Sequence, residues 1–307
     1  MKPVRAAVIQ SSPVIFDKKA TLVKVDLLLG EAAAAGAQLA LLPEAFVSAY
    51  PKGLDFGARV GQRSAEGRKW FRRYWESSID VPGEDTAALG EMAARHKLHV
   101  VIGVIERDGG TLYCTVLFFA PDGSMLGKHR KVMPTAMERI VWGYGDGSTL
   151  NVFDTPMGKL GAVICWENYM PLLRMSMYSQ GIELYCAPTV DDRPVWTSAM
   201  RHVAFEGRCF VLSAVQHVTK ADLPADYPAV FEGPVIRGGS VIVDPLGNVL
   251  AGPVFDQDCV LTADLNPDAI LEGKYDLDVT GHYARPDIFR LDVNRRAMPA
   301  VRFEEIE

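Results

Sequence analysis

The chain has 307 residues, of which 49% are hydrophobic and 23% charged, and its formal net charge is -6 at pH 7. This length and composition are typical of a globular protein with one large domain or two modest ones. The acidic balance excludes an extended basic face, so we expect no nucleic-acid partner. No apolar run approaches the roughly 20 residues of a membrane-spanning helix, and the start, MKPVRAAVIQSSPV, lacks the features of a secretory signal. We therefore expect no membrane contact and a cytoplasmic location.

Strand-like and helix-like segments alternate along the whole chain. In chain order, the pattern first predicts a strand at 5–12, a helix at 19–35 closed by Gly36, a strand at 37–44, a helix at 86–97, a strand at 99–107 and a hairpin turn at 108–110 leading into a strand at 112–121. It then predicts strands at 159–166, 182–189 and 209–216, helices at 171–180 and 196–206, and a hairpin over 240–252 with its turn at 245–248. The irregular segment 220–234 is interpreted as a surface excursion.

The predicted strands are near-continuous runs of Val, Ile, Leu and Ala, as expected when both faces of a sheet are covered. No internal repeat, low-complexity tract or linker divides the chain. The pattern therefore predicts one α/β domain over residues 1–307, built either from two stacked sheets or from one large mixed sheet, with helices outside. A short C-terminal tail is expected from about residue 290.

The five cysteines are scattered, and no pair has C-x-x-C spacing. Because their number is also odd, we expect neither a zinc site nor a disulfide framework. Four of them lie in apolar strand-like text and are interpreted as small buried side chains in a reducing compartment: Cys114, Cys186, Cys209 and Cys259. Cys165 has a different context.

Two charged side chains interrupt apolar text. Glu44 follows a predicted buried strand and Pro43, and active sites of α/β folds gather at strand ends. Taken alone, Glu44 is better interpreted as a helix N-cap or a surface acid. Lys131 lies in the segment GKHRKVMPTAMERIVWGYGDGS, where a solvated basic turn is the simple interpretation. However, the Val, Met, Ile and Trp residues around Lys131 make the segment apolar enough to be buried, and buried charges need partners.

Cys165 stands where a predicted strand ends and WENYMPLLRM begins a helix. At such a junction the helix N-terminus and a nearby ammonium would both lower the pKa of a thiol. Neighbouring backbone N–H groups could also stabilise a developing anion. A buried, inert thiol is the usual interpretation of a cysteine, but the Trp-Glu-Asn that follows is unusual for a core position. Cys165 is therefore a candidate nucleophile.

Together, and in this order, Glu44, Lys131 and Cys165 resemble the catalytic triad of the nitrilase, or carbon-nitrogen hydrolase, superfamily. The resemblance runs from AAVIQ near the start to GHYARPDIFRLDVN near the end. Within the superfamily, HRKVMPT, ERIVWG and CWENYMPLLR resemble the true nitrilase branch, whereas amidases and carbamoylases usually have another residue where this chain has Trp166. The text CAPTVDDRPVWTSAMRHVAFEGRCFVLSA resembles plant-type and related bacterial nitrilases.

The resemblance implies a single-domain α-β-β-α sandwich that pairs with a second copy through its helices. The helix within 170–181 would then be a candidate dimer face, although core packing explains its apolar residues as well. Nitrilases often form larger spiral assemblies with the help of a C-terminal tail. The short tail of this chain argues against long filaments.

The resemblance also implies roles for individual residues. Glu44 would be the general base, Lys131 the cationic stabiliser, Cys165 the nucleophile, and Glu138 a second carboxylate that positions the substrate or the lysine. A nitrile would be converted to the carboxylic acid and ammonia through a thioimidate and a thioester on the sulfur, with no metal or organic cofactor. His129 would share the face of Lys131 in an extended segment, and it either tunes the site or acts as a structural hydrogen-bonding group.

We expect the substrate pocket to be lined by residues that follow each triad member in the sequence. Its candidate lining residues are Tyr50, Pro51, Trp142, Trp166, Thr189, Val190, Asp191 and Arg193. Aromatic lining favours aryl, arylacetyl or medium aliphatic nitriles. A polar amino-nitrile such as β-cyanoalanine stays open, because Arg193 or Asp191 could meet a zwitterion. Each aromatic residue could equally well belong to the core.

Two other functions stay open at this point. The first is an amidase or carbamoylase on the same scaffold, which would release ammonia from amides but not from nitriles. The second is a catalytically silent, oligomeric binding protein that keeps the fold. An intact set of Glu44, Lys131 and Cys165 speaks against the second, and a Cys165 that does not react with alkylating agents would speak for it.

Overall fold

Two seven-stranded sheets form the centre of the computed structural model, which describes residues 3–301. The first sheet has the order β16-β1-β2-β6-β7-β8, with β5 paired to β6; the second has the order β13-β14-β12-β11-β10-β9, with β15 paired to β14. The first sheet contains β1 (Val4–Gln10), β2 (Leu39–Leu41), β5 (Ile79–Asp80), β6 (His99–Asp108), β7 (Thr111–Phe119), β8 (Met125–Arg130) and β16 (Cys259–Leu265). The second contains β9 (Val152–Thr155), β10 (Gly158–Ala162), β11 (Leu184–Cys186), β12 (Phe210–Ser213), β13 (His217–Val218), β14 (Ile236–Val243) and β15 (Val249–Phe255). A separate small hairpin joins β3 (Ala58–Arg59) and β4 (Gln62–Arg63).

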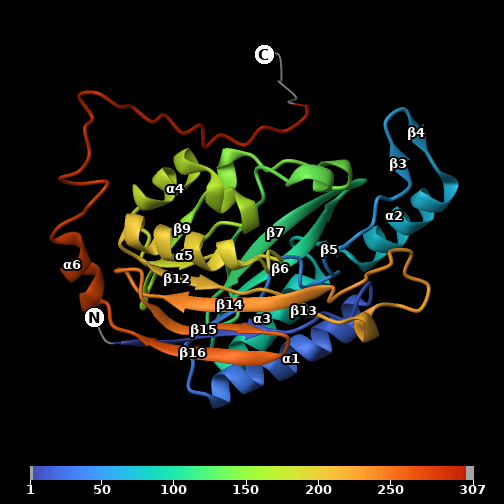
Figure 1. Cartoon of the computed structure of the whole chain (residues 1–307), viewed down its shortest axis with the longest axis horizontal. Coiled ribbons are helices and arrows are strands. Elements are labelled where there is room, and N and C mark those ends of the chain that lie inside the picture. Colours follow the sequence, from blue (N-terminus) through green and yellow to red (C-terminus); the bar gives the residue numbers. More distant parts are fainter. Residues whose placement is uncertain (1–2, 302–307) are drawn as a thin grey trace, which may run out of the picture.

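Four of the six α-helices in the described residues cover the outer faces of the two sheets, whereas the two that carry Tyr74 and Ile270 lie beside the sandwich (Figure 1). The six α-helices are α1 (Lys18–Ala34), α2 (Ala65–Ser77), α3 (Glu84–His96), α4 (Pro171–Tyr178), α5 (Pro194–Gly207) and α6 (Asp268–Lys274). Short 3-10 helices span Ala136–Ile140, Gly147–Thr149, Cys165–Tyr169 and Lys220–Asp222. Helices α1 and α3 pack on the first sheet, and α4 and α5 on the second. Within residues 3–301, no helix is both long and apolar enough to cross a membrane.

The side chains of each central strand point alternately to two different cores, because successive residues of a strand face opposite sides. In β1, Ala6 and Val8 lie in the core between the two sheets, whereas Ala7 and Ile9 pack against the outer helices. In β11, Leu184 faces the other sheet and Tyr185 faces α4 and α5. This double burial explains the near-continuous apolar runs in the sequence.

The order of the layers confirms the predicted α-β-β-α sandwich. The centre consists of two stacked sheets and not of one large mixed sheet. Several elements were not predicted, among them helices α2 and α6 and strands β8, β9 and β16. The strand expected at 159–166 was predicted too long, because it ends at Ala162. As a result Cys165 begins a 3-10 helix rather than ending a strand. The segment 220–234 holds only the short 3-10 helix Lys220–Asp222, as expected for a surface excursion.

The topology gathers the carboxyl ends of several strands at one edge of the sandwich. Strands β1, β2 and β6 are mutually parallel, and so are β10, β11 and β12. Strand β8 runs in the same direction as β6, since both are antiparallel to β7. The loops after β2, β8, β10 and β11 carry Glu44, Lys131, Cys165 and Thr189, respectively.

Candidate active site

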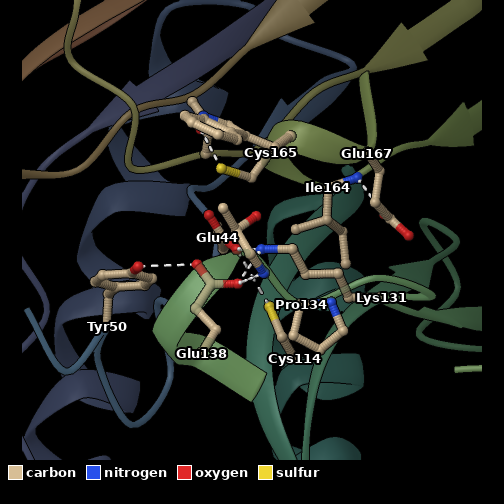
Figure 2. A network of polar contacts seen from close by, with 12 residues as sticks. Glu44, Tyr50, Cys114, Lys131, Pro134, Glu138, Ile164, Cys165 and Glu167 are labelled. Carbon is tan, nitrogen blue, oxygen red and sulfur yellow. Dashed lines mark hydrogen bonds and ion pairs between the residues drawn. The ribbon is translucent and has the colours of Figure 1, made fainter. Parts of the chain in front are cut away.

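The three residues singled out from the sequence converge in the interior between the two sheets (Figure 2). The side chains of Glu44 and Lys131 are completely buried, and Cys165 is 3% exposed. Lys131 Nζ donates to Glu44 Oε1 at 2.6 Å and to Glu138 Oε2 at 2.8 Å. One ammonium therefore joins two carboxylates from segments that lie 94 residues apart in the chain.

The loop carrying Glu44 is held in place through its backbone. Gln216 Nε2 donates to the Glu44 carbonyl oxygen at 2.7 Å. Ala45, directly after Glu44, has a left-handed backbone with φ of 51°, a conformation that L-residues rarely adopt outside constrained sites. Gly103 of β6 allows the loop to approach, because a Cβ there would lie 2.3 Å from the Pro43 carbonyl oxygen and 2.7 Å from Glu44 Cα.

The two oxygens of the Glu44 carboxylate differ in their hydrogen bonding. Oε1 accepts from Lys131 and is 3.5 Å from the sulfur of Cys114, whereas the buried Oε2 has no hydrogen-bond partner among the described residues. A buried polar atom without a partner is costly and needs an explanation, of which a catalytic role is one. Burial raises the pKa of Glu44 to about 6, the Lys131 ammonium opposes this change, and Glu138 adds to it.

Lys131 is a permanent cation in this environment. Burial alone would lower its pKa, but the charges of Glu44 and Glu138 raise the pKa of Lys131 well above its usual range. Glu138 is held in turn by Tyr50, whose hydroxyl donates to Oε1 at 2.8 Å, and by the Thr135 backbone N–H, which donates to Oε2 at 2.7 Å.

Cys165 is presented on a strained backbone. Its φ is 50°, and its N–H donates to the Pro188 carbonyl oxygen at 2.9 Å. A non-glycine residue in the left-handed region costs about 1–3 kcal/mol, so the surrounding structure must enforce this turn. Thr189 Oγ1 lies 3.1 Å from the sulfur and its hydroxyl donates to it. The side chain thus enters the same buried space as Glu44 and Lys131 (Figure 2).

The expected low pKa of the thiol was wrong. Burial, with the nearby Glu44 carboxylate, raises the pKa of Cys165 well above its usual range; the Lys131 ammonium and the Thr189 hydrogen bond oppose this only in part. The 3-10 helix after Cys165 is five residues long, so its dipole is short. Cys165 is therefore a thiol at rest, and any role as a nucleophile requires a base that takes its proton.

The residues proposed to line a pocket divide into buried and exposed groups. Tyr50 binds Glu138, and Trp142, 2% exposed, lies in the core with its ring 5.4 Å from Lys131 Nζ. Val190 is buried beside Thr189, whose hydroxyl lies 3.1 Å from the sulfur of Cys165.

Trp166 and Arg193 are the exposed members of the set. Trp166 is 41% exposed directly after Cys165, and its Nε1 donates to Asp191 Oδ2 at 2.8 Å. The Arg193 guanidinium is paired with Asp191 and lies 4.8 Å from the centre of the Trp166 ring. These three side chains form one connected wall next to Cys165.

Sequence reasoning missed three residues of the site. Cys114 was interpreted as an inert buried thiol, yet its sulfur contacts the Glu44 carboxylate. Glu167 is buried and binds the backbone on both sides of the site, and Gln216 holds the Glu44 loop. Of the other cysteines, Cys186 and Cys209 are buried as expected, whereas Cys259 is only partly buried. His129 contacts Glu167 rather than Lys131.

Residues 5–275 match the carbon-nitrogen hydrolase family, and the chain belongs to this family. It is 54% identical to a bifunctional nitrilase/nitrile hydratase of Nicotiana tabacum over 98% of this chain and 88% of the relative. It is also 54% identical to an aliphatic nitrilase of Sinorhizobium fredii, over 98% and 99% of the two chains.

Solved structures show the same fold at lower identity. A branch 10 member of the nitrilase superfamily from Saccharomyces cerevisiae superposes with a TM-score of 0.75 at 23% identity, covering 92% of this chain and 97% of that one. An amidase from Nesterenkonia superposes with a TM-score of 0.67 at 21% identity, over 88% and 93% of the two chains.

Proposed function

We propose that the protein hydrolyses organic nitriles to carboxylic acids and ammonia, with Cys165 as nucleophile. The observation that carries this proposal is the buried contact network in which Lys131 lies between Glu44 and Glu138 beside the Cys165 thiol. The identity of 50–54% to nitrilases from plants and bacteria supports nitriles over amides as substrates.

The first step joins the sulfur to the substrate. Glu44 takes the thiol proton as the sulfur attacks the nitrile carbon, and the same proton is passed to the nitrile nitrogen, which gives a thioimidate. Lys131 stabilises the negative charge that develops on nitrogen during the attack. A Glu44 pKa of about 6 suits both directions of this transfer near neutral pH, since the carboxylate is largely ionised there and still basic.

Two water molecules complete the reaction. Glu44 activates the first, which adds to the thioimidate carbon, and the resulting tetrahedral intermediate loses ammonia to leave a thioester. The second water, activated in the same way, releases the carboxylic acid and returns the thiol. The free Oε2 of Glu44 is the oxygen available to accept these protons, because Oε1 is occupied by Lys131.

The substrate class that fits the site is an apolar nitrile, namely aryl, arylacetyl or medium aliphatic. Trp166 presents a half-exposed ring next to the nucleophile, and Tyr169 packs on it edge-to-face with the ring centres 5.7 Å apart. Such aromatic surfaces favour apolar substituents. The Arg193 charge is already neutralised by Asp191, which argues against a dedicated site for a substrate carboxylate.

We further propose that the sandwich forms a homodimer as the unit of any larger assembly. The outer helix α4 supports this, because Leu172 is 69% exposed on it, and large exposed apolar side chains favour interfaces. The five free cysteines support a reducing compartment such as the cytoplasm.

The reaction is tested by measuring ammonia release from phenylacetonitrile, benzonitrile, an aliphatic dinitrile and β-cyanoalanine, each beside its amide. We expect release from nitriles by the wild type and by Cys209→Ala, which removes another fully buried thiol, but not by Cys165→Ala. Release from amides alone would make the protein an amidase. Activity that survives in Cys165→Ala would refute the assignment of the nucleophile.

A further inference from the structure

The carboxylate of Glu167 is completely buried and points away from Cys165 toward a second loop (Figure 2). Oε2 accepts from the backbone N–H of Ile164 at 2.9 Å, and Oε1 accepts from the backbone N–H of Val132 at 2.6 Å. Ile164 directly precedes Cys165, and Val132 directly follows Lys131. One side chain therefore binds the backbone next to both residues.

The two loops that Glu167 joins belong to different sheets. Lys131 follows β8 of the first sheet, and its N–H donates to the Cys114 carbonyl oxygen of β7. Cys165 follows β10 of the second sheet, and its N–H donates to the Pro188 carbonyl oxygen. These backbone bonds hold each loop to its own sheet, whereas the Glu167 carboxylate connects one loop to the other.

A third donor completes the set around Glu167. His129 Nε2 lies 3.0 Å from Glu167 Oε2, and both side chains are buried. On the other side of the ring, Thr149 Oγ1 lies 3.4 Å from Nδ1 and accepts from the Arg130 backbone N–H. The Thr149 proton is thus free to bond to Nδ1, so that Nε2 carries a hydrogen and donates to Glu167. Three N–H donors then compensate a buried carboxylate, as such a group requires.

We propose that Glu167 is a positioning residue for the reaction, and that His129 keeps its carboxylate oriented. The Glu167 carboxylate and the two backbone N–H groups that it binds, those of Ile164 and Val132, form a clamp. This clamp fixes the separation between the sulfur of Cys165 and the ammonium of Lys131, without touching the substrate. This inference rests on the proposed function for its kinetic consequences, and on the geometry alone for the reactivity of Cys165. Misplacement of reacting groups by about 1 Å can cost about a hundredfold in rate.

The test is Glu167→Gln, which keeps the size of the side chain but has a single acceptor oxygen. In either orientation of the amide, the backbone N–H of Ile164 or of Val132 faces its NH2 group, so the clamp opens on one side. We expect kcat for nitrile hydrolysis to fall at least about tenfold, with KM within about threefold of wild type, because the wall of Trp166 and Arg193 is not altered. Alkylation of Cys165 by iodoacetamide, followed by mass spectrometry of its peptide, should slow by at least about fivefold.

The matched control is Arg208→Met, which removes another buried charge that binds backbone. Arg208 is 2% exposed, and it donates to the Pro245 carbonyl oxygen and to Asp276. It precedes β12, at the edge of the second sheet opposite to Cys165. We expect this variant to lose thermal stability while its kcat stays within about twofold of wild type. A folded Glu167→Gln with wild-type kcat, or with a loss no larger than that of Arg208→Met, overturns the proposal.

A second pair of variants decides the matter if Glu167→Gln does not fold. His129→Gln keeps a donor near the position of Nε2, whereas His129→Leu removes it. We expect kcat of the leucine variant to be at least about fivefold below that of the glutamine variant, and equal values overturn the role of the clamp. The alkylation rate needs no nitrile. It therefore separates a failure of the clamp, seen as unchanged alkylation in the variants, from a failure of the proposed function, seen as an inactive wild type.

Discussion

The acid limb of the pH–rate profile should report the ionisation of Glu44. The proposed role of Glu44 as general base requires a deprotonated carboxylate, and kcat/KM reports the ionisation of groups in the free enzyme. Burial and the charge of Glu138 raise the pKa of this carboxyl to about 6, compared with 4.5 for an ordinary glutamate. We therefore expect kcat/KM to be level near neutral pH and to fall about tenfold per pH unit below about 6.

Replacing Glu138 by Gln should move this limb to lower pH. Lys131 Nζ contacts oxygens of both carboxylates at 2.6 and 2.8 Å, so these two oxygens lie at most about 5.4 Å apart. With an effective dielectric constant of about 20, two negative charges at that separation repel by about 3 kcal/mol, which equals about 2 pH units. Removal of one charge makes the other carboxylate easier to ionise. The sign of the shift is therefore downward, and we expect a displacement of roughly 1–2 pH units.

The assay is ammonia release from one good nitrile between about pH 4.5 and 8.5 at constant ionic strength, with kcat/KM taken at each pH. Circular dichroism at the same pH values separates ionisation from acid unfolding, and kcat is expected to be lower in Glu138→Gln at every pH. A wild-type limb at or below 4.5 would show that burial does not govern this carboxyl. A limb that stays in place or moves upward in Glu138→Gln would refute the coupling between the two carboxylates.

Three further substitutions test the packing around the site. Gly103→Ala should lower kcat by at least about tenfold and lower Tm, because its Cβ would collide with the Pro43 carbonyl oxygen; Gly110→Ala, which faces open space, is the control. Thr189→Val should slow both turnover and alkylation of Cys165 by about tenfold or more, because the hydroxyl that lowers the pKa of the thiol is lost. Trp166→Ala should raise KM for aromatic nitriles more than for small aliphatic ones, in a kinetic comparison of the two classes.

Each of these substitutions has a result that would contradict its reasoning. Equal activities of the Gly103 and Gly110 variants would show that the Glu44 loop adapts to an added methyl group. A Thr189 variant with the alkylation rate of wild type would mean that its hydroxyl does not govern the sulfur. A uniform change in KM across all nitriles would remove Trp166 from the substrate wall.

The sequence predicted the elements that have a clear apolar pattern, namely strands covered on both faces and helices with one apolar face. It missed elements that lack such a pattern. Strand β6 and helix α3 carry long apolar patterns, and they were expected within a few residues of their actual ends. Helix α2 was missed because AEGRKWFRRYWES is dominated by charged residues, and only one face of it is buried. Strand β16 was missed because its side chains are mostly half-exposed and its partner, β1, lies about 250 residues earlier. Such long-range pairing leaves no local trace.

The residues of the site could be predicted where a charged or nucleophilic residue interrupts an apolar segment, but the environment of these residues could not. Glu44 and Lys131 stood out because charged residues are unusual in segments that are apolar enough to be buried, and the structure places them in contact. The direction of the Cys165 pKa shift could not be predicted, since the local sequence suggested a helix N-terminus and a cation, whereas the burial of the thiol dominates. The role of Cys114 depends on a contact with a residue 70 positions earlier, and nothing in its own strand indicates this contact.

The most direct test of covalent chemistry at Cys165 is the mass of its peptide during turnover. Wild-type enzyme mixed with excess nitrile is quenched in acid within one turnover, digested, and analysed by mass spectrometry, beside Cys165→Ala. We expect a peptide heavier by the thioimidate or acyl group, with the added mass on Cys165, and no adduct or ammonia from the alanine variant. Ammonia formed at the wild-type rate by Cys165→Ala, or an adduct on another residue such as Cys114, would contradict this expectation.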